Sequence, residues 1–184
     1  MTLCFALTLS FTLDLVQEVL ELTKAANTQL PGLRLAVMPL GSAFTLCDGW
    51  PGESPTTPPD SVSRFVLRGP LDAAQSKGDE VRGQLRGMGL ESSASSAWVL
   101  PMFCTDDFQT EAMMPFFFSE AELVAGWVRM GRPEEEAMFF LHTVMDLRAL
   151  VANMANSDEM PWSKFQLVTS AAAYELAQKL TAAA

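Results

Sequence analysis

The sequence predicts an α+β fold, in which helices cover a sheet of short strands. The clearest indication is the stretch of residues 98–130, where a turn-favouring cluster at residues 105–107 separates two short apolar runs that predict strands over residues 98–103 and 113–118. The pattern of an amphipathic helix follows directly. The 184-residue chain is 49% hydrophobic and 18% charged, which supplies enough apolar material for a packed core.

A faint internal repeat indicates that the fold is pseudo-symmetric. Residues 37–40 (VMPL) resemble residues 99–102 (VLPM), and residues 65–67 are an apolar run before a helix, as are residues 116–118. A Pro-rich insertion accounts for the longer spacing in the first copy. We therefore expect two related halves of strands and a helix that build one shared core.

The predicted organisation is an N-terminal docking segment followed by one domain. The docking segment is residues 1–30 and the domain is residues 31–184. The halves of this domain are predicted at residues 31–90 and 97–184, with a Ser-rich span between them.

The docking segment combines a strand pattern with a helix pattern. Residues 1–13 carry no charge and have a large apolar residue at every odd position. This period of two favours a strand with one buried face, although a helix that continues into the next segment is the alternative. The run is shorter than the roughly 20 apolar residues that span a bilayer, and it lacks the pattern of a secretory signal. Residues 14–30 predict a helix, which Pro31 and Gly32 end.

The first half of the domain begins with a predicted strand over residues 33–40, and residues 43–47 are a candidate continuation of this strand. Residues 49–60 are rich in Pro, Gly, Ser and Thr and predict a surface connection. Residues 64–68 form a strand candidate, and a helix is expected from Gly69 to about Arg86.

In the second half, Ser119 fits a helix N-cap with Glu122 three residues further on, so each side chain can satisfy a backbone donor of the first turn. Buried positions of this helix are predicted at Leu123, Val124, Trp127 and Val128.

The C-terminal part predicts a strand over residues 138–145, a helix capped by Asp146, a strand over residues 165–169 and a last helix to about Leu180. In the Asp146-capped helix the apolar stripe is Leu147, Leu150, Val151 and Met154. The residues expected to form the core are Trp98, Phe103, Phe117, Leu123, Trp127, Leu147, Leu150 and Leu167.

Residue chemistry argues against catalysis, and no cofactor or metal ligand is predicted. Asp106 and Asp107 are interpreted as turn residues, and the single histidine, His142, as a core residue in an apolar strand. The sequence has no C-x-x-C pair, no phosphate-binding glycine loop and no nucleophile elbow. The three cysteines are expected to be buried thiols, with a Cys47–Cys104 disulfide as the alternative in an oxidising compartment. A net charge of −10 without a basic stripe makes nucleic acid an unsuitable partner.

Four segments carry a family resemblance: WVLPMFCTDDF, MMPFFFSEAELVAGWVRM, VMDLRALVANM and WSKFQLVTSAAAYELAQKL. They resemble the Tic-twenty-two family of plastid and cyanobacterial proteins, which are linked to preprotein transport at the inner envelope. The shared features are a strand of the PVF-x-x-x-D type, a phenylalanine-rich strand before a helix, and a helix of the DL-x-x-LV-x-x-M type. The resemblance covers residues 98–180, is weaker over residues 33–85 and does not reach residues 1–30. Residues 100–103 (LPMF) depart from the usual proline-valine-phenylalanine order, as in a divergent member.

The resemblance implies a non-enzymatic, chaperone-like protein of a plastid that holds preprotein clients in apolar grooves. The alternative is a structural accessory subunit that docks on a plastid membrane complex, such as a photosystem or a translocon. Either function implies a protein partner and a position peripheral to a membrane, in the intermembrane space, in the stroma or at the thylakoid.

The residues predicted to bind the partner are Phe5, Leu7, Leu9 and Phe11, at the centre of the uncharged N-terminal run. Their side chains share one face of a strand, and such an apolar face in water invites association. Replacing Leu7 and Leu9 by Ser is expected to release the protein from membranes while its near-ultraviolet dichroism is retained. Association with membranes that persists with an unchanged spectrum would contradict the docking prediction.

Overall fold

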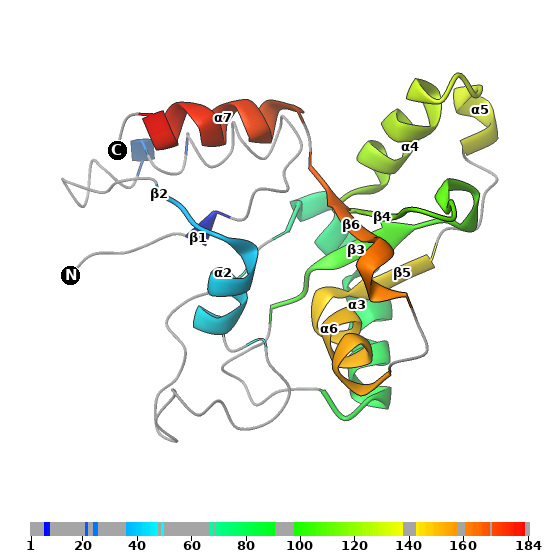
Figure 1. Ribbon diagram of the computed structural model, residues 1–184. Coiled ribbons are helices and arrows are strands. Elements are labelled where there is room, and N and C mark those ends of the chain that lie inside the picture. The colour runs from blue at the N-terminus through cyan, green and yellow to red at the C-terminus, as the bar shows by residue number, and fades with distance from the viewer. Residues whose placement is uncertain are drawn as a thin grey trace. The chain divides into compact units, whose positions relative to one another are not determined.

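The computed structural model confirms an α+β fold. It describes residues 6–7, 21, 24–25, 36–47, 49, 67, 69–90, 98–137, 143–157, 161–169 and 171–182. These residues form a four-stranded mixed sheet, a two-stranded pairing and six α-helices (Figure 1).

The chain divides into two compact units that differ from the predicted halves. The first unit contains residues 1–68, 92–98 and 169–184, and the second contains residues 69–91 and 99–168. Each unit therefore draws on both predicted halves, and the assignment of the halves stays a prediction.

The first unit contains a short parallel strand pair. Strand β1 (Ala6–Leu7) lies beside β2 (Ala36–Val37), with Ala6 opposite Ala36 and Leu7 opposite Val37. Helix α7 (Ala171–Ala182) packs against β2. The strands predicted within residues 1–13 and 33–40 are thus present over two residues each. Glu21, Lys24 and Ala25 are helical, within the helix predicted over residues 14–30.

The predicted strand extension over residues 43–47 is wrong, because helix α2 (Leu40–Leu46) occupies this part of the chain and ends at Cys47. Ala43, Phe44 and Cys47 are buried, which is the i, i+1, i+4 spacing of one helical face. Trp98 stabilises this arrangement, since its indole Nε1–H donates to the Cys47 carbonyl at 2.8 Å and its ring meets the Phe44 ring edge-on at 6.0 Å. A short apolar run alone does not distinguish a strand from such a helix.

The second unit is built on a mixed sheet with the strand order β5-β3-β4-β6. Strand β3 (Pro101–Cys104) runs antiparallel to both β4 (Met114–Phe117) and β5 (Thr143–Asp146), whereas β6 (Phe165–Val168) runs parallel to β4. Each strand lies within a predicted strand or, at β3 and β5, extends one residue beyond it. The short 3-10 helices η2 (Asp106–Phe108) and η3 (Trp162–Lys164) precede β4 and β6.

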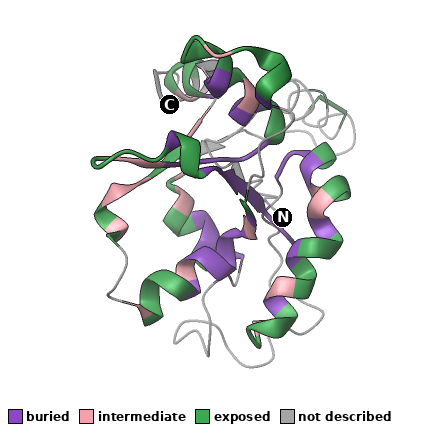
Figure 2. Cartoon of the chain, turned by 90° about the vertical axis from the view of Figure 1, so that its right-hand side faces the viewer, coloured by how far each residue is buried: buried purple, intermediate pink, exposed green. Residues whose placement is uncertain are grey.

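One face of this sheet carries the aromatic core. Phe103 lies opposite both Phe117 and Val144, so these three side chains share a face. Helix α3 (Leu71–Gly87) packs against β3 and β5, and helix α4 (Glu120–Arg129) packs against β3 and β4. Figure 2 shows buried residues in the central strands and a mixture of buried and exposed residues along the helices.

Two short helices complete the second unit: α5 (Glu134–Ala137) packs against α4, and α6 (Leu147–Asn156) follows β5 directly. Seven of the eight predicted core residues are buried, and Leu167 is the exception. Leu167 lies on β6, the edge strand of the described sheet, and its register with Phe116 places its side chain on the face opposite to that of Phe117.

Two further residues of the predicted stripes are exposed, Val128 on α4 and Met154 on α6. On α4, the buried face is centred on Leu123, Gly126 and Trp127, because Gly126 lets the helix approach the Phe117 ring. On α6, the small residues Ala149 and Ala152 are buried in place of Met154. A stripe drawn through the largest apolar residues misses such close-packing small ones.

Trp127 anchors α4 to the sheet. Its side chain is 1% exposed, its Nε1–H donates to the Pro133 carbonyl at 3.0 Å, and the Arg132 guanidinium lies 4.3 Å from its ring centroid. Phe108 meets the Trp127 ring edge-on at 5.8 Å. Truncation therefore removes packing, a hydrogen bond and a cation–π contact together.

We expect Trp127→Ala to lower the free energy of unfolding by about 3–5 kcal/mol, as for a fully packed aromatic residue. The matched control is Val128→Ala on the same helix, where the side chain is 46% exposed; its effect should stay within about 0.5 kcal/mol. Urea denaturation measures both. Equal midpoints for the two variants would show that α4 does not pack through Trp127.

A buried carboxylate joins three elements of the second unit. Asp146 caps α6 and is fully buried, with its Oδ1 accepting from the Arg148 N–H at 2.8 Å and from Arg148 Nε at 3.1 Å. Its Oδ2 accepts from the Leu100 N–H at 2.9 Å, just before β3. Burial raises the pKa of this carboxyl, while the Arg148 charge and the N–H groups of Leu100 and Arg148 oppose the rise.

Removing this carboxylate takes away the acceptor that Asp146 supplies to the buried Arg148 side chain and to the Leu100 N–H. Asp146→Ala is therefore expected to cost about 3–5 kcal/mol of unfolding free energy, and Asp146→Asn less, since it keeps one acceptor oxygen. The control is Asp79→Ala, which removes an exposed Asp79–Arg82 pair at 3.3 Å and should leave the denaturation midpoint unchanged. A midpoint for Asp146→Ala that matches the control would contradict the structural role of Asp146.

Candidate partner-binding surface

Strand β6 presents an open edge within the part of the chain that the structure describes. Its hydrogen-bonded neighbour there is β4, on one side. The strand, FQLV, contains no charged residue and no proline, the devices that usually protect an edge from pairing with another chain. Leu167 at its centre is 41% exposed. The edge thus offers backbone donors and acceptors next to an apolar side chain.

A line of aromatic rings extends from the core to the start of β6. The ring of buried Phe116 stacks on Phe165, with centroids 4.9 Å apart and an interplanar angle of 17°. Phe165 in turn meets the half-buried ring of Trp162 at 4.8 Å. The Trp162 Nε1–H donates to the Ser157 carbonyl. This indole is therefore held in place while part of its ring stays accessible.

The β6 surface, defined here as Met114, Trp162, Phe165 and Leu167, lies on one face of the sheet edge. Met114 is opposite Phe165 in the register, and Leu167 is opposite Phe116, which places these side chains on a common face. Met114, Trp162 and Phe165 are half-buried. Such a surface can bind an extended chain, because backbone hydrogen bonds at the edge supply affinity and the apolar side chains contact alternate residues.

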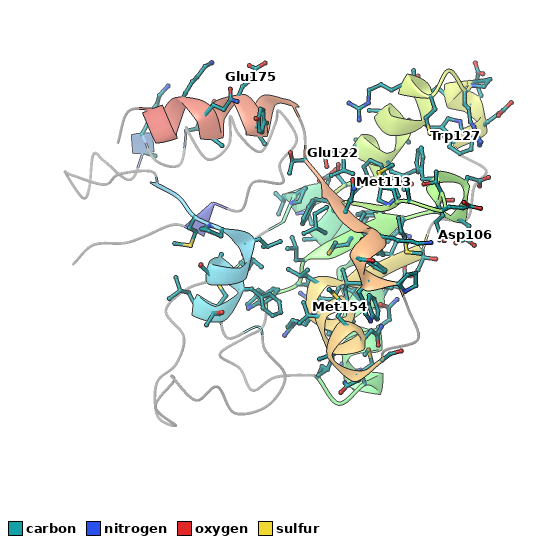
Figure 3. The ribbon with its side chains drawn as sticks, viewed as in Figure 1. Asp106, Met113, Glu122, Trp127, Met154 and Glu175 are labelled. Atoms are coloured by element: carbon teal, nitrogen blue, oxygen red, sulfur yellow. The ribbon has the colours of Figure 1, made fainter. Side chains whose placement is uncertain are left out.

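Sequence reasoning missed this surface because it assigned Leu167 to the core. The pattern FQLVT contains one signal in the other direction, since Gln166 interrupts the apolar run as expected for a strand exposed on one side. Figure 3 shows the side chains of this unit, with Met113 labelled beside β4 and Met154 on α6.

The partner-binding residues predicted at the N-terminus are not placed by the structure. Phe5, Leu9 and Phe11 lie outside the described residues, as does the side chain of Leu7. The described backbone of Ala6–Leu7 pairs with β2 of the same chain. The docking role of the segment stays a prediction.

The two aspartates considered for catalysis have structural partners. Asp106 and Asp107 are exposed residues of η2 (Figure 3 labels Asp106). The Asp106 Oδ1 accepts from Gln109 Nε2 at 2.6 Å, and the Asp107 Oδ1 lies 3.8 Å from Arg132 Nη1. Their surroundings match the turn interpretation. His142 lies outside the described residues.

The cysteine thiols of Cys47 and Cys104 are free and buried, so the alternative of a disulfide between them is not realised. Burial raises the pKa of each thiol to about 11, and the charge of Asp106 adds to the rise at Cys104. Both are neutral near pH 7 and are therefore weak nucleophiles.

Within the described ranges, no group of three or more His, Cys, Asp or Glu side chains could hold a metal ion. No helix among those residues is long and apolar enough to cross a membrane.

No family model, curated protein or solved structure matches this chain.

Proposed function

We propose that this chain is a non-enzymatic plastid protein that binds extended preprotein segments in a chaperone-like manner, as the resemblance to the Tic-twenty-two family implies. The observation that carries the proposal is the β6 surface, where a strand edge that is unpaired among the described residues lies beside half-buried aromatic side chains and the exposed Leu167. An unfolded client can pair with both features of this surface, because it offers backbone donors and acceptors as well as apolar side chains.

Most of the residues that carry the resemblance lie in the second unit, whereas Trp98 and residues 169–180 belong to the first. Residues 98–130 supply β3, β4 and α4; the DLRALVANM segment caps and forms α6; and WSKFQLV forms η3 and β6. Residues 101–103 (PMF), compared above with the family's PVF pattern, lie in strand β3. The phenylalanine-rich pattern lies in strand β4.

The pseudo-symmetry expected of such a fold also belongs to the proposal, and one of its two matches has a structural parallel. Leu67 is buried and comes shortly before α3, as the buried Phe118 comes shortly before α4. In the other match, Leu40 begins helix α2, whereas Met102 lies in strand β3.

The chemistry of the β6 surface suits transient binding more than a permanent interface. Its core is a single four-residue strand with one exposed leucine, which is small beside the roughly 800 Å² per partner of a stable interface. We therefore favour client binding over the alternative of a structural subunit held on a membrane complex.

Leu167→Lys tests the proposal, because it places a charge on the strand edge and removes its exposed apolar group. We expect affinity for a fluorescently labelled, extended apolar peptide to fall about tenfold, with a matching loss of suppression of aggregation of a denatured reporter protein. The control is Leu71→Lys at the first residue of α3. Leu71 is 42% exposed, so the control makes the same chemical change at equal exposure.

Equal peptide affinity for Leu167→Lys and Leu71→Lys would overturn the assignment of the β6 surface. If one stoichiometric partner co-purified with the unmodified protein, and no client peptide bound, the accessory-subunit alternative would be supported instead.

A further inference from the structure

Glu122 is a buried acid whose carboxyl oxygens make no well-formed hydrogen bond to any residue that the structure describes. It is 8% exposed and lies in the first turn of α4, and both carboxyl oxygens lack a partner within bonding geometry (Figure 3). The predicted capping box is therefore half formed. Ser119 Oγ accepts from the Glu122 N–H at 3.1 Å, but the Glu122 side chain does not return a bond to the cap.

The groups around Glu122 do not compensate for its burial. Burial raises the pKa of its carboxyl above the ordinary value of 4.5, while the Phe118 N–H and the Arg129 charge lower it by less. Strand β4, packed against α4, has no ionisable side chain, and β3 contributes only the neutral Cys104 thiol. The remaining charged groups on α4 and on the adjoining α5 and η2 are exposed acids: Glu120, Glu134, Glu135, Glu136, Asp106 and Asp107. Arg132 lies in the connection between α4 and α5.

We propose that Glu122 makes the packing of α4 on the sheet sensitive to pH, with the protonated acid holding the helix in place and the ionised form loosening it. The Phe118 N–H and the Arg129 charge only partly offset the burial of the carboxylate, so ionisation favours a state in which the first turn of α4 moves toward water.

The sign of the effect follows from the raised pKa. The folded state binds the proton more tightly than the unfolded state, so packing is strongest below the ordinary glutamate pKa and weakens as the pH rises through the folded-state value. Loosening α4 uncovers the aromatic side chains beneath it, Phe117 and Phe108, which contact each other at 5.4 Å and lie against Gly126.

Hydrogen exchange of the full-length protein tests the proposal. We compare protection factors of residues 119–130 with those of α3 at about pH 4, below the ordinary glutamate pKa of 4.5, and at about pH 8. In the unmodified protein, protection of residues 119–130 relative to α3 should fall by about tenfold at the higher pH, in line with the usual cost of an unpaired buried polar group. In Glu122→Gln, which cannot ionise, this fall should be absent.

The control is Glu120→Gln, which removes an exposed acid from the same helical turn and should keep the fall seen in the unmodified protein. All other ionisable groups are common to the three proteins, so differences among them report on the substituted acid. An equal fall in the unmodified protein and in Glu122→Gln would overturn the proposal.

A direct titration provides a measurement that needs no variant to fold. The carboxyl carbon of Glu122, followed by ¹³C NMR in the unmodified protein, should titrate clearly above the ordinary glutamate pKa of 4.5. A midpoint at or below 4.5 would also overturn the proposal.

Discussion

The second unit depends on the buried carboxylate of Asp146. It lies where strand β5 ends and helix α6 begins, and it binds the backbone just before β3 through the Leu100 N–H. The Leu147 N–H donates back to the Leu100 carbonyl at 3.1 Å. These two bonds fix the register in which Phe103 lies opposite Val144, and thereby align the residues that α3 and α4 cover. A buried charge is tolerated here because Arg148 and two N–H groups surround it.

Glu122 presents the opposite case in the same unit. Both acids stand at the beginning of a helix, yet Asp146 has three hydrogen-bond donors and Glu122 has no partner within bonding geometry. The difference makes one helix start rigid and leaves the other dependent on protonation. Helix α4 still packs because Leu123 and Trp127 contribute a large apolar surface that outweighs the cost of one buried acid.

The β6 surface follows from the order of the strands. Because β6 is parallel to β4 and lies at the edge of the described sheet, its backbone pairs on one side and Leu167 remains exposed. The rings of Phe116, Phe165 and Trp162 connect this edge to the interior, so the exposed side chains rest on a packed base. A partner that binds there would meet a preformed surface, which lowers the entropic cost of association.

The sequence by itself determined the α+β class, the strands on both sides of the turn at Asp106, and the helix caps at Ser119 and Asp146, because these depend on local periodicity and on short-range hydrogen bonds. It did not determine α2, where the indole of Trp98, 51 residues further along the chain, binds the carbonyl that ends the helix. It also did not determine which apolar residues stay exposed. Leu167, Val128 and Met154 have the same side-chain chemistry as apolar residues that are buried. The strand order places Leu167 at an exposed position, and the close approach of Gly126 and of alanines does the same for Val128 and Met154. That placement is set by contacts distant in sequence, which a local pattern does not contain.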